Sequence, residues 1–256
     1  MPITLVEQFV EVMPDASELY SDEPEMESSL HYDQLDLLVR ILKRWWHDRQ
    51  DFFIGANLSI YFSRQQLKTR DFRGPDFFLV KNTESRPRNS WVVWEEDGRY
   101  PDLIIELLSH STAAIDRELK LKIYQDRFRT PEYFWFSPDT LEFKGFKLVD
   151  GEYQEIEPDE RGWRWSQAIG LYLGVEAGKL RYFTAEGDKI LSPEEAEIEE
   201  ARRAEREAHR AEREAQRAER EAQRAEQALH SLDEERRRAE QMAARLRELG
   251  IDPASL

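Results

Sequence analysis

One acidic residue lies inside an apolar segment of this 256-residue chain. Glu106 belongs to PDLIIELLS (101–109), where apolar residues occupy both faces of the expected strand, so its carboxylate should be buried. Burying a carboxylate without a partner costs several kcal/mol, so a cation, a metal ion or strong hydrogen bonds must stabilise it. The sequence therefore predicts a charged site around Glu106.

Two further residues are candidates for this site. Asp76 begins another apolar segment, DFFLV, and would approach Glu106 if the two segments pair in a sheet. Carboxylate oxygens suit a hard cation such as Mg²⁺, or Mn²⁺ in its place, and a water on such an ion can attack a phosphodiester. Lys120 lies at the centre of the apolar face of an expected helix, where an inward-facing lysine needs an anion. Asp76, Glu106 and Lys120 are thus the predicted catalytic residues.

The same residues also allow a purely structural interpretation. A buried Glu–Lys pair can stabilise a fold without chemistry, and Asp76 can cap a turn after Gly74-Pro75. Asp116 and Tyr124, four residues to either side of Lys120, are supporting candidates that can equally line the inner face of the helix. The five histidines show no metal-ligand spacing, which disfavours zinc.

Hydrophobic periodicity predicts the elements that position these residues. In chain order they are a helix over 31–50, a strand over 51–63 that is interrupted at Gly55-Ala56-Asn57, strands over 76–80, 91–98 and 101–109, a helix over 113–128, a strand over 132–137 and hairpins over 141–192. An Asp150-Gly151 pair predicts the turn of the first hairpin. This order describes a mixed α/β domain.

Four segments also resemble a known family. They are GPDFFLV (74–80), PDLIIELLSHST (101–112), the helical spacing Asp116-xxx-Lys120-xxx-Tyr124, and PEYFWFSP (131–138). Together they resemble the Uma-type endonucleases, a bacterial branch of the PD-(D/E)xK restriction-endonuclease-like superfamily, over about residues 25–185. The resemblance implies a mixed β-sheet flanked by helices and Mg²⁺-dependent cleavage of DNA.

The resemblance also implies roles for single residues. Asp76 corresponds to the aspartate of the first motif and Glu106 to the glutamate of the second, with Asp102 as a supporting carboxylate. The superfamily lysine normally follows that glutamate by two residues, where this chain has Leu108. As in the Uma branch, the lysine is then on the following helix, as Lys120.

Charge and composition bear on partners and location. The net charge of −16 is unfavourable for DNA binding, which needs Lys and Arg facing phosphates. Among the basic residues, only weak DNA-binding candidates stand out: Arg64, Lys68, Arg70, Arg86 and Arg88. The chain has no cysteine, signal peptide or apolar stretch approaching the ~20 residues of a membrane helix. We therefore expect a soluble, cytoplasmic protein.

The C-terminal part repeats the heptads AEREAHR and AEREAQR. Its apolar residues alternate three and four apart, which is typical of a coiled coil, although a lone helix held by Glu–Arg pairs fits as well. The expected organisation is an irregular acidic lead-in (1–30), a restriction-endonuclease-like domain (31–192) and a coiled-coil tail (193–256) that forms a homo-oligomer or binds a partner. A catalytically silent nuclease-fold head on an assembly stalk is the alternative to an active endonuclease.

Overall fold

The computed structural model describes residues 14–63, 66, 74–108 and 115–248. The chain divides into two compact units, Met1–Pro193 and Glu194–Leu256. The helices are η1 (Ala16–Glu18), α1 (Ser29–Trp45), η2 (Val93–Glu95), α3 (Ile115–Lys122), the π-helix η3 (Ile123–Phe128) and α4 (Pro193–Glu248). The strands are β1 (Phe52–Ala56), β2 (Ile60–Tyr61), β3 (Phe77–Lys81), β4 (Trp91–Val92), β5 (Leu103–Leu107), β6 (Glu132–Phe136), β7 (Phe143–Val149), β8 (Glu152–Glu155), β9 (Arg164–Ser166), β10 (Leu171–Glu176) and β11 (Lys179–Phe183).

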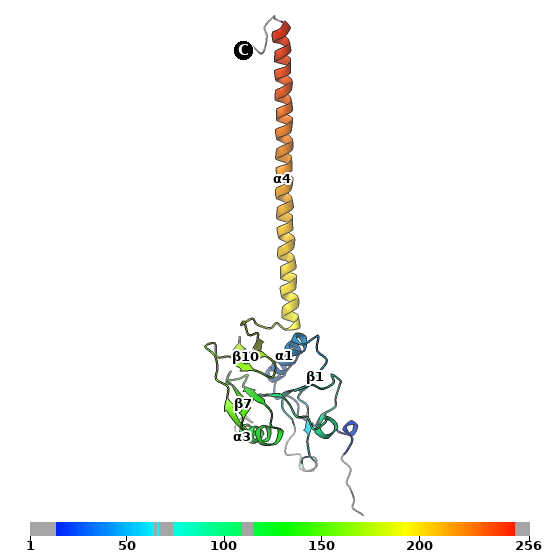
Figure 1. Ribbon diagram of the computed structural model, residues 1–256, viewed down its shortest axis with the longest axis vertical. Helices are drawn as coiled ribbons and strands as arrows, with labels where there is room; N and C mark the ends of the chain where they lie inside the picture. The colour runs from blue at the N-terminus through cyan, green and yellow to red at the C-terminus, as the bar shows by residue number, and fades with distance from the viewer. Residues whose placement is uncertain (1–13, 64–65, 67–73, 109–114, 249–256) are drawn as a thin grey trace, which may run out of the picture. The chain divides into compact units, whose positions relative to one another are not determined.

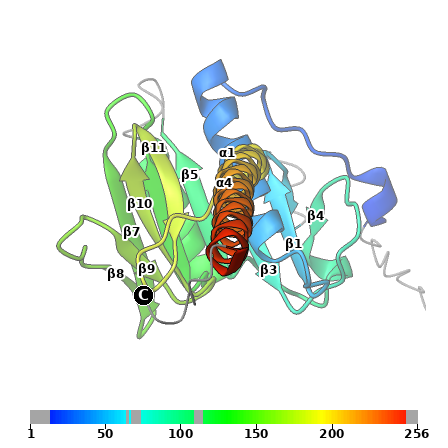
Figure 2. The ribbon, with the colours of Figure 1, turned by 90° about the horizontal axis from the view of Figure 1, so that it is seen from above.

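A six-stranded mixed sheet forms the centre of the first unit, in the order β1-β3-β5-β6-β7-β8 (Figure 1). The strand β5 pairs with β3 in antiparallel and with β6 in parallel orientation. On one face, α1 packs between the sheet and β11, and alternate residues such as Phe77 and Ile105 join this core (Figure 2). On the other face, Phe78 and Ile104 pack with Tyr124 of η3. The predicted mixed α/β class with flanking helices is confirmed.

Local sequence explains the boundaries of these elements. The side chain of Ser28 accepts a hydrogen bond from the backbone N–H of His31, so Ser28 caps the start of α1. At the turn between β7 and β8, Asp150 and Gly151 have φ values of 52° and 92°. This left-handed pair matches a tight hairpin turn, as the sequence predicts.

The strand expected over 51–63 is divided at the predicted interruption, into β1 and β2. Asn57 has a φ of 45°, which turns the chain after β1. The short β2 that follows pairs in parallel with β4, outside the central sheet. The segment 141–192 forms antiparallel hairpins, as predicted, and β9, β10 and β11 make a separate three-stranded sheet.

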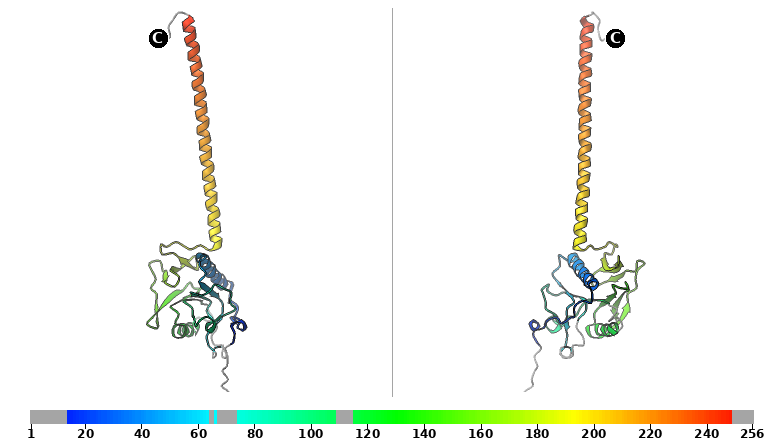
Figure 3. Two further views of the ribbon diagram at one scale, coloured as in Figure 1. Left: turned by 45° about the vertical axis from the view of Figure 1, so that its right-hand side comes forward. Right: turned by 180° about the vertical axis from the view of Figure 1, so that it is seen from behind.

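In the second unit the structure describes residues 194–248, which belong to the 56-residue helix α4 (Figure 3). At about 1.5 Å per residue, such a helix is roughly 84 Å long. Its described side chains are almost all exposed, including Leu229 and Leu232. Within the described part of the chain, no helix combines the length and apolar character needed to cross a membrane.

Gly145 in β7 leaves room for the ring of Phe134 on the neighbouring strand β6. Gly145 pairs with Phe134, and a Cβ on Gly145 would lie 2.3 Å from that ring. We expect Gly145→Ala to lower the free energy of unfolding by about 1–3 kcal/mol, because the buried ring must shift. Lys144→Ala, which loses only an exposed ion pair to Glu155, should cost less than about 1 kcal/mol. Equal losses of unfolding free energy for the two variants, measured by urea denaturation, would contradict the close contact between Gly145 and Phe134.

Candidate active site

The pairing of β3 with β5 brings the two predicted carboxylates together. Phe77 lies opposite Ile105 in the antiparallel register, so continuing by one residue sets Asp76 opposite Glu106. The carboxylate of Asp76 accepts a hydrogen bond from the backbone N–H of Leu107 at 2.7 Å. Asp76 is therefore fixed against the strand that carries Glu106.

The approach to Asp76 depends on a glycine. A Cβ on Gly74 would lie 2.2 Å from the backbone oxygen of Leu58, so no larger residue fits without a backbone shift. Two residues later, the carbonyl oxygen of Asp76 accepts a hydrogen bond from the N–H of Asn57 at 2.7 Å. The Gly-Pro-Asp segment is thus held against the turn that follows β1.

Glu106 is buried, with 2% of its surface exposed, and a donor lies at each carboxylate oxygen. Lys120 donates from Nζ to Oε2 at 2.9 Å, and the hydroxyl of Tyr124 donates to Oε1. Lys120 lies in the last turn of α3. Tyr124 lies four residues later, in η3, on the same helical face. The neighbouring Lys122 is exposed. The helix therefore supplies one positive charge and one hydroxyl to the buried carboxylate.

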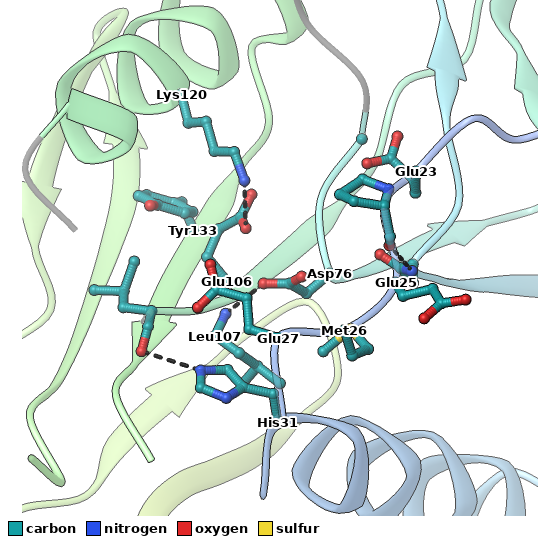
Figure 4. Close-up of a pocket in the computed structure, with 14 residues that line it drawn as sticks. Glu23, Glu25, Met26, Glu27, His31, Asp76, Glu106, Leu107, Lys120 and Tyr133 are labelled. Carbon is teal, nitrogen blue, oxygen red and sulfur yellow. Dashed lines mark hydrogen bonds and ion pairs between the residues drawn. The ribbon is translucent and has the colours of Figure 1, made fainter. Parts of the chain in front are cut away.

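A cavity of about 140 Å³ opens beside these groups and is lined by Asp76, Glu106 and Lys120 (Figure 4). This volume can hold several water molecules, each of which occupies about 30 Å³ in the liquid. Residues 23–27 of the acidic lead-in, with three glutamates, also line the cavity. The cavity therefore brings together carboxylates from the lead-in, β3 and β5.

Hydrogen bonds to the turn after β1 hold the lead-in at the cavity. Ser59 is fully buried, and its hydroxyl lies 3.0 Å from Asp22 Oδ1 and 2.8 Å from Glu23 Oε1. The side-chain amide of Asn57 donates to the carbonyl of Pro24 at 2.9 Å. The sequence alone did not indicate that the lead-in lies at the site, because these contacts join residues more than 30 positions apart.

His31 is a second residue that sequence analysis missed. It is 4% exposed, and its ring lies 2.9 Å from Ser28 Oγ through Nδ1 and 3.3 Å from the carbonyl oxygen of Leu108 through Nε2. It thus connects the start of α1 to the end of β5, and it lines the cavity (Figure 4). A polar residue three positions after a helix-capping serine was the only sequence signal for it.

The electrostatics of the site follow from burial and like charge. Burial raises the pKa of Asp76 well above its ordinary value, and the negative charge of Glu106 raises it further, while Lys120 opposes both. Burial and then the charge of Glu106 also raise the pKa of Tyr124. Tyr124 consequently keeps its proton and remains a hydrogen-bond donor. The pair of carboxylates favours a proton or a cation between them.

The structure does not bring every predicted residue to the cavity. Asp102 precedes β5, at the opposite end from Glu106, and accepts a hydrogen bond from the N–H of Lys81 at 2.7 Å. Asp102 and Glu106 are four residues apart, and four residues of a strand extend about 13 Å, so the two carboxylates do not reach the same cavity. The side chain of Asp116 lies outside the described residues. Asp102 therefore stabilises the C-terminal end of β3, away from the cavity.

The basic loop after β3 is also engaged elsewhere. Arg88 lies 2.6 Å from the carboxylate of Glu96, and Arg86 lies 2.8 Å from the same group. The side chain of Arg88 is 3% exposed and its guanidinium stacks over Phe53. These two arginines stabilise the fold. Arg64, Lys68 and Arg70 lie outside the described residues.

Comparisons with known proteins identify the family. Residues 6–180 match the family described as "Uma2: Putative restriction endonuclease". The chain therefore belongs to the Uma2 family, a class of restriction-endonuclease-like proteins. A crystal structure of "a putative nuclease belonging to DUF820" from Anabaena variabilis ATCC 29413 is similar at 17% identity, with a TM-score of 0.39, over 54% of this chain and 72% of that one. No curated protein matches the chain.

The residues at the cavity suit one kind of metal ion better than another. Within the described ranges, no group of three or more His, Cys, Asp or Glu residues is placed so that it could hold a metal ion. Two carboxylates with room for water fit Mg²⁺, which typically binds one or two carboxylates and keeps several waters. A closed zinc site needs four protein ligands and does not fit.

The raised pKa of Asp76 predicts a pH dependence of stability without divalent ions. The folded state binds this proton more tightly than the unfolded state, so the free energy of unfolding should fall as pH rises from the ordinary carboxyl pKa of 3.8 through the raised pKa. Asp76→Asn has no carboxyl group to ionise at this position, so its free energy of unfolding should not fall in this way. The variant should therefore exceed the wild type in stability at pH 7–8, and the excess should disappear near pH 4 in urea denaturation.

The exposed Asp139 provides the control, because Asp139→Asn removes a carboxylate that water already solvates. We expect this variant to follow the wild-type pH profile. If the stability difference between Asp76→Asn and the wild type is constant from pH 4 to pH 8, folding does not raise the pKa of Asp76.

Proposed function

We propose that the protein is a Mg²⁺-dependent endonuclease that hydrolyses phosphodiester bonds of DNA at the cavity beside Glu106. One observation supports this most directly: Asp76, Glu106 and Lys120, from two strands and a helix, line a single cavity. Membership of the Uma2 family agrees with a nuclease. Mn²⁺ is the expected substitute for Mg²⁺, because it prefers similar oxygen ligands.

Each residue would have a distinct part in the reaction. Asp76 and Glu106 would hold the ion, which when bound supplies a Lewis acid and lowers the pKa of water. Lys120 places a positive charge 2.9 Å from Glu106, where it can hold a phosphate oxygen or orient the attacking water. Tyr124 keeps Glu106 in one orientation through its hydroxyl. It is a positioning residue, because it reaches the cavity only through Glu106.

Nicking of supercoiled plasmid DNA tests the three central residues. We expect Mg²⁺-dependent nicking that a chelator abolishes, and a loss of about 10²–10³-fold in rate for Asp76→Asn, Glu106→Gln and Lys120→Met. Lys122→Met is the matched control, because this lysine is exposed two residues from Lys120 and should leave the rate unchanged. Nicking by Glu106→Gln at the wild-type rate would exclude this cavity as the active site.

Removal of the Tyr124 hydroxyl tests the support of Glu106. Tyr124→Phe leaves one carboxylate oxygen without its donor, so Mg²⁺ affinity or the nicking rate should fall by about 10–100-fold. Isothermal titration measures the affinity. Tyr153→Phe removes a tyrosine hydroxyl that donates to the Thr130 carbonyl, outside the cavity, and should change neither quantity. Equal effects of both variants would mean that Tyr124 contributes only to stability.

A second candidate function is a catalytically silent head on an assembly stalk. One observation favours it: three glutamates of residues 23–27 line the same cavity and would repel a phosphate backbone. Absence of divalent binding in calorimetry, together with loss of cellular function on deletion of 194–256, would favour this candidate. Metal-dependent nicking that persists without residues 194–256 would favour the endonuclease.

A further inference from the structure

The tail helix α4 carries a row of apolar residues along one side. From Ala201 to Ala243 the row alternates three and four residues apart, as positions a and d of a heptad do. Its largest side chains, Leu229 and Leu232, are 68% and 65% exposed. Between Gln227 and Leu232 the chain has no carboxylate, so this segment is the most apolar part of the row.

Acidic residues flank the row on both sides. Positions e and g of the same heptads border the apolar row, and from residue 200 to residue 240 they hold eleven acidic residues and one alanine. The acidic residues are Glu200, Glu205, Glu207, Glu212, Glu214, Glu219, Glu221, Glu226, Asp233, Glu235 and Glu240. No Lys or Arg occupies a flanking position in this range.

The arginines lie on the opposite side of the helix. Between residues 202 and 224 all eight occupy positions b, c and f, and Arg236 alone lies in the apolar row. Some contact acidic residues of the same helix, as Arg210 does with Glu214 at 3.1 Å. These pairs are exposed and weak, so basic residues of a partner can compete for the same glutamates.

This arrangement disfavours pairing with a second copy in either direction. In a parallel pair, position g of one helix faces position e of the next heptad in its partner, which places Glu207 opposite Glu212 and repeats along the helix. In an antiparallel pair, e faces e and g faces g, so acidic residues again oppose one another. The small alanines bury little apolar area to compensate.

We propose that α4 binds a helix of a different protein, whose own apolar row is bordered by lysine or arginine. Such a partner would pair a basic residue with each acidic one along both borders of α4, and its large apolar side chains would cover Leu229 and Leu232. Charge complementarity of this kind determines which coiled-coil partners associate. The tail would thus recruit a basic helical partner rather than join two copies of this chain.

A charge-reversed form of the full chain can serve as the basic probe. It carries lysine in place of seven border glutamates: Glu205, Glu207, Glu212, Glu214, Glu219, Glu221 and Glu226. Light scattering should find the wild type and the probe each monomeric at low salt, and their mixture as a 1:1 complex. Its dissociation constant should rise by about tenfold or more between about 50 and 500 mM NaCl, because salt screens exposed charges.

A second variant keeps the test valid if circular dichroism shows that the probe has lost helix. Lysine at positions e alone, in place of Glu205, Glu212, Glu219 and Glu226, leaves glutamate at g, so this variant should form a parallel dimer with itself. The control adds four lysines to the opposite side, at His209, Gln216, Gln223 and Gln227, and should remain monomeric.

Two outcomes would overturn the proposal. One is a wild-type chain that dimerises through α4 at low salt. The other is a failure of both the mixture and the position-e variant to associate, which would make α4 a lone helix.

Discussion

The carboxylate of Glu106 lies inside a strand whose other residues are apolar, and the surrounding structure satisfies its charge. Both oxygens accept hydrogen bonds, from Lys120 on one side and Tyr124 on the other. In a region of low dielectric constant, these interactions are stronger than in water. The loss of either one leaves the buried carboxylate without one of its donors in an apolar environment. The position of the helix α3–η3 is therefore coupled to the chemistry of the strand β5.

Asp76 adds a second carboxylate to the same cavity, and this addition works against the stability of the site. Its pKa is raised by burial and by Glu106, so the folded protein holds the ionised pair at a cost unless a cation or a proton joins it. Active sites are often less stable than their surroundings for this reason. A cavity that is unfavourable when empty and favourable with a cation agrees with the proposed dependence on a divalent ion.

Charge is distributed differently in the two units. At the cavity, acidic residues surround one lysine, and the lead-in adds three glutamates. Along α4, acidic and basic residues lie on opposite sides of one helix. In both units the acidic groups restrict what can approach, since like charges repel whereas a cation or a basic surface is attracted.

Most of the central site could be predicted from the sequence. Apolar residues on both faces of the strand identified β5 and the burial of Glu106, and the helical period identified Lys120 as inward-facing, because both patterns depend on local geometry that every strand and helix shares. The Asp150-Gly151 turn and the heptads of the tail followed from the same kind of local rule.

Other features were decided only by the tertiary structure. The contact of Asp76 with the Leu107 N–H, the buried His31 and the acidic segment at the cavity all join residues far apart in the chain, and no local period encodes such contacts. The sequence indicated the interruption at Gly55-Ala56-Asn57, but only the structure shows that β2 then pairs with β4 outside the central sheet. Local patterns thus determined which side chains face inward, whereas strand register and chain reversals determined which of them meet.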